Sequence, residues 1–154
     1  MINVPDKIFN REFEEIDVGI STLSFFKKED LENAQIGYKY DDKKESIKGW
    51  KGEEFVVIGN DSALGDPIIA KVDEEDVPIY SMFHDDWSSF EKVAESFEQY
   101  MGILEMIDKT DLHRRDRIID LLDEIEEIVP EDSYYYWEDL INSAFDFFAD
   151  SYEE

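Results

Sequence analysis

The sequence predicts an α+β protein in which a mostly antiparallel β-sheet packs against helices and the C-terminal portion is helical. Between residues 16 and 83, apolar residues recur with the two-residue period of strands or form short unbroken runs. After residue 86 the period changes to the roughly 3.6 residues of a helix. Strands that come first and helices that follow are typical of the α+β class.

The first strand is predicted over residues 16–26. Ile16, Val18 and Ile20 alternate there with polar or small residues, as expected of a half-buried strand. Residues 28–37 favour one or two helical turns closed by a glycine.

The middle of the chain predicts the rest of the sheet. Residues 38–51 mix charged and aromatic residues and predict a solvated loop. Residues 55–59 form an apolar run rich in β-branched side chains, which is typical of a central strand covered on both faces. Two further strands, at 68–72 and 77–83, are joined by an acidic turn at 73–76. Together these segments predict an antiparallel meander.

Three helices are predicted after the sheet. The first is expected from Ser88 or Ser89, as its N-cap, to Leu104. The second is expected over 112–129, where a proline ends it, and the third over 132–148.

The chain is expected to form a single domain over residues 1–154. Its 154 residues match the usual size of one domain, and no repeat or Pro/Gly-rich linker interrupts it. Within it we expect a core at about 16–108 and a helical extension at 109–154.

Charge is the outlying property of the sequence. Fifteen Lys and Arg against 41 Asp and Glu leave a formal net charge of −26. Such a surface repels phosphates and anionic lipids and attracts cationic partners. We therefore expect a basic protein partner, and neither nucleic acid nor a membrane. An acidity that only keeps the protein soluble, or that reflects a salt-adapted source, is the alternative.

The expected location is the cytoplasm. The chain has no cysteine, which excludes disulfides, thiol catalysis and Cys-based zinc sites and suits a reducing compartment. No signal-peptide pattern is visible, and no apolar run approaches the roughly 20 residues that span a bilayer.

Little in the sequence points to catalysis. His84 follows a predicted strand beside Asp85 and Asp86, and a carboxylate could orient it as a general base. The alternative is a set of ordinary polar residues in a strand-to-helix turn. No phosphate-binding loop, EF-hand or nucleophile elbow is present. We expect no enzyme activity, no metal and no cofactor.

Aromatic residues among acids mark candidate partner-binding positions. Helical spacing buries only one stripe of rings, so some aromatic side chains should remain at the surface as anchors for a partner. Tyr134 and Tyr135 are the candidates. Asp61, Asp85 and Asp86 are the candidate acidic contacts at strand ends. The alternative is a wide aromatic core with tyrosines at its rim.

A series of residues between 50 and 104 carries a resemblance to a known family. In order they are Trp50, the strand Phe55-Val-Val-Ile-Gly59-Asn60-Asp61, Gly65-Asp66-Pro67-Ile68, Pro78-Ile-Tyr80, His84, Trp87 and Val93-Ala-Glu-Ser-Phe-Glu-Gln-Tyr100. This segment resembles the SUKH superfamily of Smi/Knr-like domains, which occur widely in bacterial toxin-immunity loci. The family's amphipathic N-terminal helices are missing or much reduced here.

The residues of this pattern have scaffold roles. Glycines permit tight turns at strand ends, an Asp-Pro pair starts a strand where the missing N–H does little harm, and tryptophans cap the sheet. The residues concerned are Trp50, Gly59, Gly65, Asp66, Pro67 and Trp87.

The resemblance implies a non-catalytic immunity protein that neutralises a cognate toxin domain. Together with the charge, it favours a basic toxin, for which a nuclease is one candidate. An intracellular scaffold or regulatory protein without a toxin partner is the alternative, and a hydrolase that uses His84 is a third hypothesis.

Overall fold

A computed structural model describes residues 4–11, 14–18, 21–84 and 86–152, without the side chains of Trp87 and 147–152. Its strands form one six-stranded antiparallel sheet in chain order: β1 (Glu15–Asp17), β2 (Thr22–Phe25), β3 (Phe55–Asp61), β4 (Pro67–Lys71), β5 (Ile79–Phe83) and β6 (Asp86–Ala94). Its helices are η1 (Asp6–Phe9), η2 (Lys28–Asp30), α1 (Leu31–Ala34), α2 (Phe97–Asp108), α3 (Arg115–Ile128) and α4 (Glu131–Tyr152). The predicted α+β class and the antiparallel meander are confirmed.

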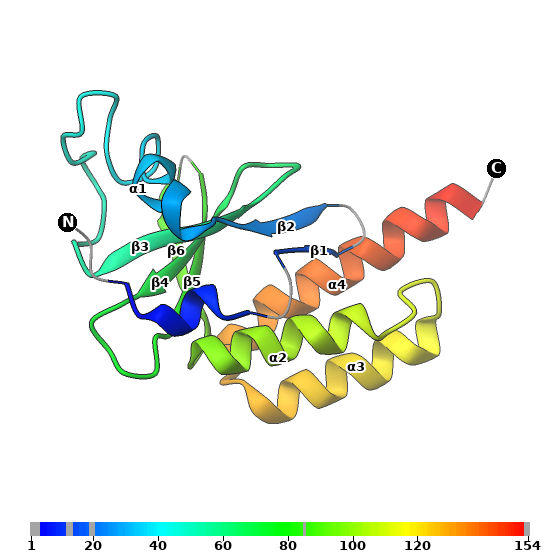
Figure 1. Ribbon diagram of the computed structural model, residues 1–154. Helices are drawn as coiled ribbons and strands as arrows, with labels where there is room; N and C mark the ends of the chain where they lie inside the picture. Colours follow the sequence, from blue (N-terminus) through cyan, green and yellow to red (C-terminus); the bar gives the residue numbers. More distant parts are fainter. Residues whose placement is uncertain (1–3, 12–13, 19–20, 85, 153–154) are drawn as a thin grey trace.

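Strand β3 separates two apolar clusters. Its alternate residues Val56 and Ile58 belong to the main core, whereas Phe55 and Val57 belong to a smaller cluster on the other face. Helices α2, α3 and α4 gather on one side of the sheet and cover the main core (Figure 1). The prediction of a central strand buried on both faces is confirmed.

The prediction of one strand over residues 16–26 is wrong. Ile16 lies in β1 and pairs with Leu23 of β2, so the segment is an antiparallel hairpin. The chain reverses at residues 18–21, where the N–H of Val18 donates to the carbonyl of Ser21 at 2.9 Å. Apolar alternation continues in phase through the turn, which is why it resembled one strand. Residue 20 lies outside the described residues.

The prediction of a helix beginning at residue 88 is also wrong. Phe90 and Val93 lie in β6, where they contribute to opposite faces of the sheet. Helix α2 begins only at Phe97, after Ser96 accepts a hydrogen bond from the N–H of Gln99 at 3.0 Å. The second and third predicted helices correspond to α3 and α4, with ends shifted by a few residues.

A buried glutamine completes the hydrogen bonding of β3 beyond the end of β2. The Gln35 side chain accepts from the N–H of Val57 at 2.8 Å and donates to its carbonyl at 2.7 Å. The same amide nitrogen donates to the carbonyl of Leu31 at 2.9 Å. One side chain therefore replaces a neighbouring strand at this position and connects α1 to the sheet.

Replacing Gln35 by leucine should lower the free energy of unfolding by about 2–4 kcal/mol, because a buried donor and a buried acceptor on Val57 lose their partner. Urea denaturation measures the change. The matched control is Asn33→Leu, at an exposed position of the same helix. Equal stabilities of the two variants would contradict the strand-replacing role.

Candidate protein-binding surface

One end of the molecule gathers carboxylates from four segments that are distant in the sequence. The β4–β5 turn, the start of α2, the end of α3 and the start of α4 meet there (Figure 1). The N–H of Phe97 donates to the carbonyl of Asp76 at 3.1 Å, and the Gln99 amide donates to the carbonyl of Ile128 at 2.7 Å. We call this surface the acidic pole. Its exposed carboxylates are Asp73, Glu74, Glu75, Asp76, Glu95, Glu98, Glu124, Glu126, Glu127, Glu131 and Asp132.

The neighbouring cations neutralise only part of this charge. Lys71 binds the carboxylates of Asp73 at 2.8 Å and Glu74 at 2.9 Å. Lys7 binds Glu98 at 3.0 Å, and Lys92 binds Glu95 at 3.5 Å. Within the described part of the chain, no cation lies at ion-pair distance from the pole's carboxylates on α3 or α4. The α3–α4 side of the pole therefore keeps its negative charge.

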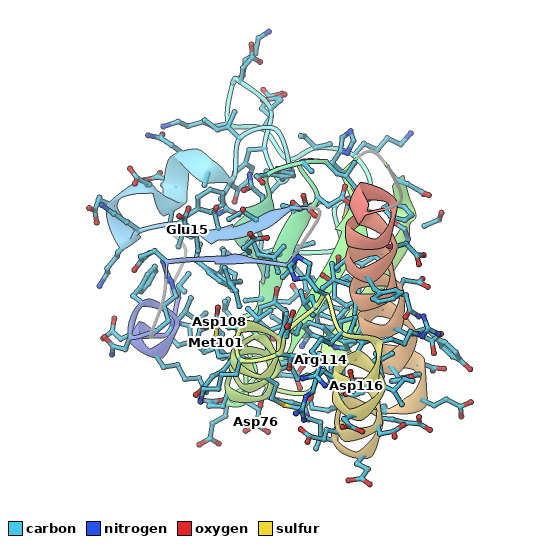
Figure 2. The ribbon with its side chains drawn as sticks, turned by 90° about the vertical axis from the view of Figure 1, so that its right-hand side faces the viewer. Glu15, Asp76, Met101, Asp108, Arg114 and Asp116 are labelled. Carbon is cyan, nitrogen blue, oxygen red and sulfur yellow. The ribbon has the colours of Figure 1, made fainter. Side chains whose placement is uncertain are left out.

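Most charges near the ends of α3 oppose its helix dipole, and Asp116 in the first turn is the exception. Arg114 is the N-cap residue and gives no side-chain cap, and Arg114 and Asp116 lie together at the start of the helix (Figure 2). The last turn holds acidic residues and no basic one. Cations at an N-terminus and anions at a C-terminus each cost about 0.3–1 kcal/mol at low salt. This charge pattern does not serve helix stability, which suggests a role outside the fold.

Exposed apolar side chains lie among these carboxylates. Tyr135 is 53% exposed and Ile128 is 46% exposed. The ring of Tyr134 lies 6.1 Å from that of Tyr135 and is half-buried. Burial raises the pKa of Tyr134 to about 12, with further contributions from a hydrogen bond to Glu138 and from the charge of Glu126. Apolar anchors surrounded by charged residues are typical of a protein interface.

Two side chains of α4 fix this helix to the edge of the sheet. The indole of Trp137 is fully buried and donates to the carbonyl of Val93 at 2.8 Å. The hydroxyl of Ser133 donates to the carbonyl of Lys92 at 2.9 Å. The first turns of α4, which carry the exposed Tyr135 and the half-buried Tyr134, are therefore held against β6.

Of the acidic candidates at strand ends, Asp86 lies far from these tyrosines. Asp86 begins β6, and Lys92, next to α4, is six residues further on, which is about 20 Å along a strand. The Asp61 carboxylate stabilises the β3–β4 turn, because it accepts from the Ser21 hydroxyl and from the N–H of Ala63 at 2.8 Å. The structure therefore does not bring Asp86 together with the tyrosines, and Asp61 has a role within the fold. Asp85 lies outside the described residues.

The carboxylate beside His84 is Asp66. The N–H of His84 donates to Asp66 at 3.0 Å, and the imidazole Nδ1 lies 3.3 Å from the same oxygen. β5 ends at Phe83 and the next element, from Asp86, is strand β6, so the predicted strand-to-helix turn is wrong. The Asp86 carboxylate accepts from the N–H of Ser88 at 3.0 Å. Among the described residues, no group of three or more His, Asp or Glu could hold a metal ion.

Only some of the residues that were predicted to have scaffold roles lie where the sequence placed them. Gly59 is not at a strand end but inside β3, next to a register shift, where a Cβ would collide with the carbonyl of Ser24. Gly65 adopts φ +75° in the β3–β4 turn, as expected of a turn glycine. Pro67, preceded by Asp66, is the first residue of β4, as predicted.

The two tryptophans were expected to cap the sheet. Trp50 packs on the smaller cluster, and its indole donates to the carbonyl of Gly52 at 2.9 Å, so it covers part of the second face. The side chain of Trp87 lies outside the described part of the structure, although its backbone belongs to β6.

Comparisons with family models, with curated proteins and with solved structures give no match to this chain. In the described part of the chain, no helix is both long enough and apolar enough to cross a membrane.

Sequence reasoning missed the acidic pole because its members come from separate segments. One signal was available: residues 118–154 contain no Lys, Arg or His. This run pointed to the α3–α4 side of the pole, whereas the contributions of the β4–β5 turn and of α2 depend on the fold.

The raised pKa of Glu91 should be measurable as a pH-dependent change in stability. Partial burial, and then the charge of Asp139, raise the pKa of Glu91 above its ordinary 4.5. A raised pKa favours the neutral carboxyl in the folded state, so its stabilising contribution is complete below the ordinary pKa and is lost as pH rises through the folded value. We therefore expect Glu91→Gln to be more stable than wild type at pH 7 and equal to it near pH ~3.

Thermal unfolding of both proteins across this pH range measures the effect. Asp42→Asn, in an exposed loop, is the control for a simple reduction of net charge. An advantage of Glu91→Gln that persists unchanged at low pH would contradict the raised pKa.

Proposed function

We propose that this protein is a non-catalytic binding protein whose acidic pole covers a basic surface of another protein. The observation that carries the proposal is the convergence of four acidic segments around the exposed side chains of Ile128 and Tyr135. An acidic rim steers a basic partner and sets specificity, whereas the apolar side chains supply affinity.

We further propose that the partner is a toxin domain and that this protein provides immunity to it in the cytoplasm. The SUKH-like pattern of residues 50–104 and the lack of cysteine support this interpretation. A nuclease is a suitable toxin, because the basic surface with which a nuclease binds phosphates also attracts carboxylates. A regulatory scaffold that uses the same acidic pole without a toxin partner is the alternative.

Catalysis has less support than binding. The His84 side chain is 54% exposed and lies in a surface turn, with Asp66 as its neighbour. The cavity described below lies instead between η1 and α2. A His84→Ala variant should therefore bind its partner and protect cells as well as wild type does.

The proposal is tested by binding to the product of the adjacent gene at rising salt. The dissociation constant should increase steeply with ionic strength, because the contact is electrostatic. Neutralising Glu126, Glu127 and Glu131 together with glutamine should weaken binding about tenfold, at roughly 0.5 kcal/mol per exposed charge. The control makes the same change in net charge elsewhere, with Glu29→Gln, Glu32→Gln and Asp42→Asn.

Equal effects of the two triple variants would exclude the acidic pole as the interface. Binding that does not depend on salt would remove the electrostatic basis of the proposal. Cells that express the neighbouring toxin provide the functional readout, since survival should fall with the pole variant and not with the control.

A further inference from the structure

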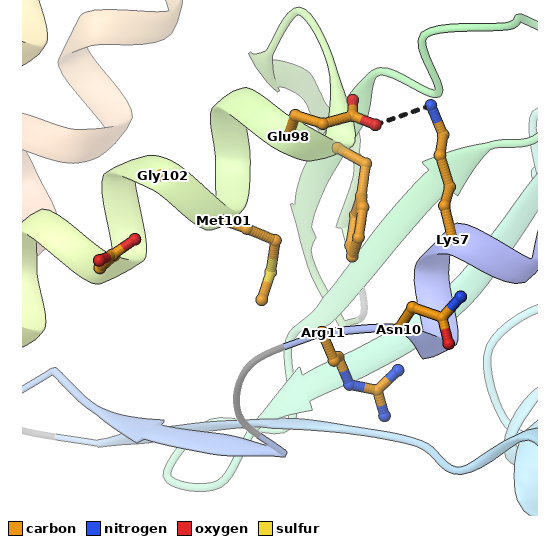
Figure 3. A pocket seen from close by; sticks show the side chains of 8 residues that line it. Lys7, Asn10, Arg11, Glu98, Met101 and Gly102 are labelled. Atoms are coloured by element: carbon orange, nitrogen blue, oxygen red, sulfur yellow. Dashed lines mark ion pairs between the residues drawn. The ribbon is translucent and has the colours of Figure 1, made fainter.

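A cavity of about 320 Å³ lies between η1 and the first turns of α2, beside the acidic pole (Figure 3). Lys7 and Arg11 line it from the N-terminal segment, and Met101 and Gly102 line it from α2. The ion pair between Lys7 and Glu98 spans the two sides at 3.0 Å. The cavity thus has an apolar wall and a charged rim.

Gly102 has no structural reason to be glycine. It lies inside α2 with no positive φ, and a Cβ at this position would meet no atom within 4 Å. Glycine in a helix interior is less stable than alanine. Its visible effect is to leave a gap in the α2 wall of the cavity.

Two carboxylates flank this gap on the same face of the helix. Glu98, Gly102 and Glu105 are spaced i, i+4 and i+7, so the backbone positions of the two glutamates are about 10 Å apart along α2. Met101, beside them, offers a polarisable apolar contact. A long cationic side chain can lay its methylenes over the glycine and place its charge between the two carboxylates.

The cations already present leave room for such a guest. The Arg11 side chain is 1% exposed, and its terminal nitrogens donate to the carbonyls of Ile8 at 2.7 Å and Phe26 at 2.8 Å and to the Glu14 carboxylate at 2.6 Å. Lys7 occupies only the Glu98 end, where it also donates to the carbonyl of Glu75 at 2.9 Å. The ion pair between Lys7 and Glu98 shows that a cationic side chain can bind a carboxylate at the edge of the cavity.

At the Glu105 end of the gap, the carboxylate forms a weak ion pair. Glu105 binds Lys109 at 2.5 Å, but the Lys109 side chain is 71% exposed. Exposed pairs of this kind contribute little, so a guest can compete for the carboxylate.

We propose that this cavity is a socket for one arginine side chain of the basic partner. The inference rests on the proposed function, because it identifies an anchor point beside the acidic pole. Arginine fits better than lysine, since its planar guanidinium carries five donors in a fixed fork and can bind a carboxylate through two of them.

The test is an amide NMR titration of the full chain with N-acetyl-arginine amide. Saturable shifts are expected at Glu98, Met101 and Gly102. The neutral isostere N-acetyl-citrulline amide should leave these signals unchanged, because it lacks the charge. Gly102→Leu should abolish the response by filling the gap.

Gly102→Ala is the folding control. It should raise the melting temperature by about 2–4 °C, because it restores helix propensity and meets no neighbour. A leucine variant that unfolds would be replaced by Glu98→Gln with Glu105→Gln, which should weaken the response about tenfold.

Shifts spread over all surface carboxylates without saturation, or a response unchanged in both Gly102→Leu and the double glutamine variant, would overturn the socket. Such a result leaves the proposed function intact, because that is measured with the partner protein and the α3–α4 variants. Conversely, a partner that never binds would refute the proposed function even if arginine enters the cavity.

Discussion

The hydrogen bond from the Trp137 indole to the carbonyl of Val93 connects the two halves of the fold. β6 is an edge strand, and outward-facing carbonyls on such a strand invite pairing with other chains. Trp137 and Ser133 satisfy two of these carbonyls with side chains of a helix. The same contacts fix where α4 begins, and through the short connection at Pro130 they also fix the end of α3. The positions of Tyr134, Tyr135 and the α3–α4 carboxylates therefore depend on the contacts of Trp137 and Ser133 with β6.

The acidic pole lowers the stability of the fold, and the packing of the core compensates for this loss. Its carboxylates repel one another, and most charges near the ends of α3 oppose the helix dipole. The stability of α3 comes instead from its buried face, where Ile118, Leu121 and Ile125 pack into the main core. The solvent-facing residues of α3 are therefore not needed for its packing.

The sequence predicted the parts of the fold that local patterns determine. Residues 55–59 had the composition of a doubly covered strand, and that is what β3 is. β6 could not be recognised, because Phe90, Val93 and Phe97 fit a helical stripe as well as a strand, and only pairing with β5 decides between them. The strand-like role of Gln35 and the assembly of the acidic pole were equally hidden, since both depend on contacts between distant segments. The surface position of Tyr135 could be predicted, because helical spacing within α4 buries only one stripe of rings.

Helix α3 also makes the molecule an electric dipole. Arg114, Arg115 and Arg117 stand at the start of this helix, where Asp116 pairs with Arg114, and Glu124, Glu126 and Glu127 stand near its end. A particle with separated charge rotates in the field of an approaching charged body, so a positive surface turns the acidic pole toward itself before contact. Orientation then begins during diffusion, and fewer collisions are wasted on the wrong face. The placement of charges thus raises the rate of encounter even where it adds nothing to the contact area.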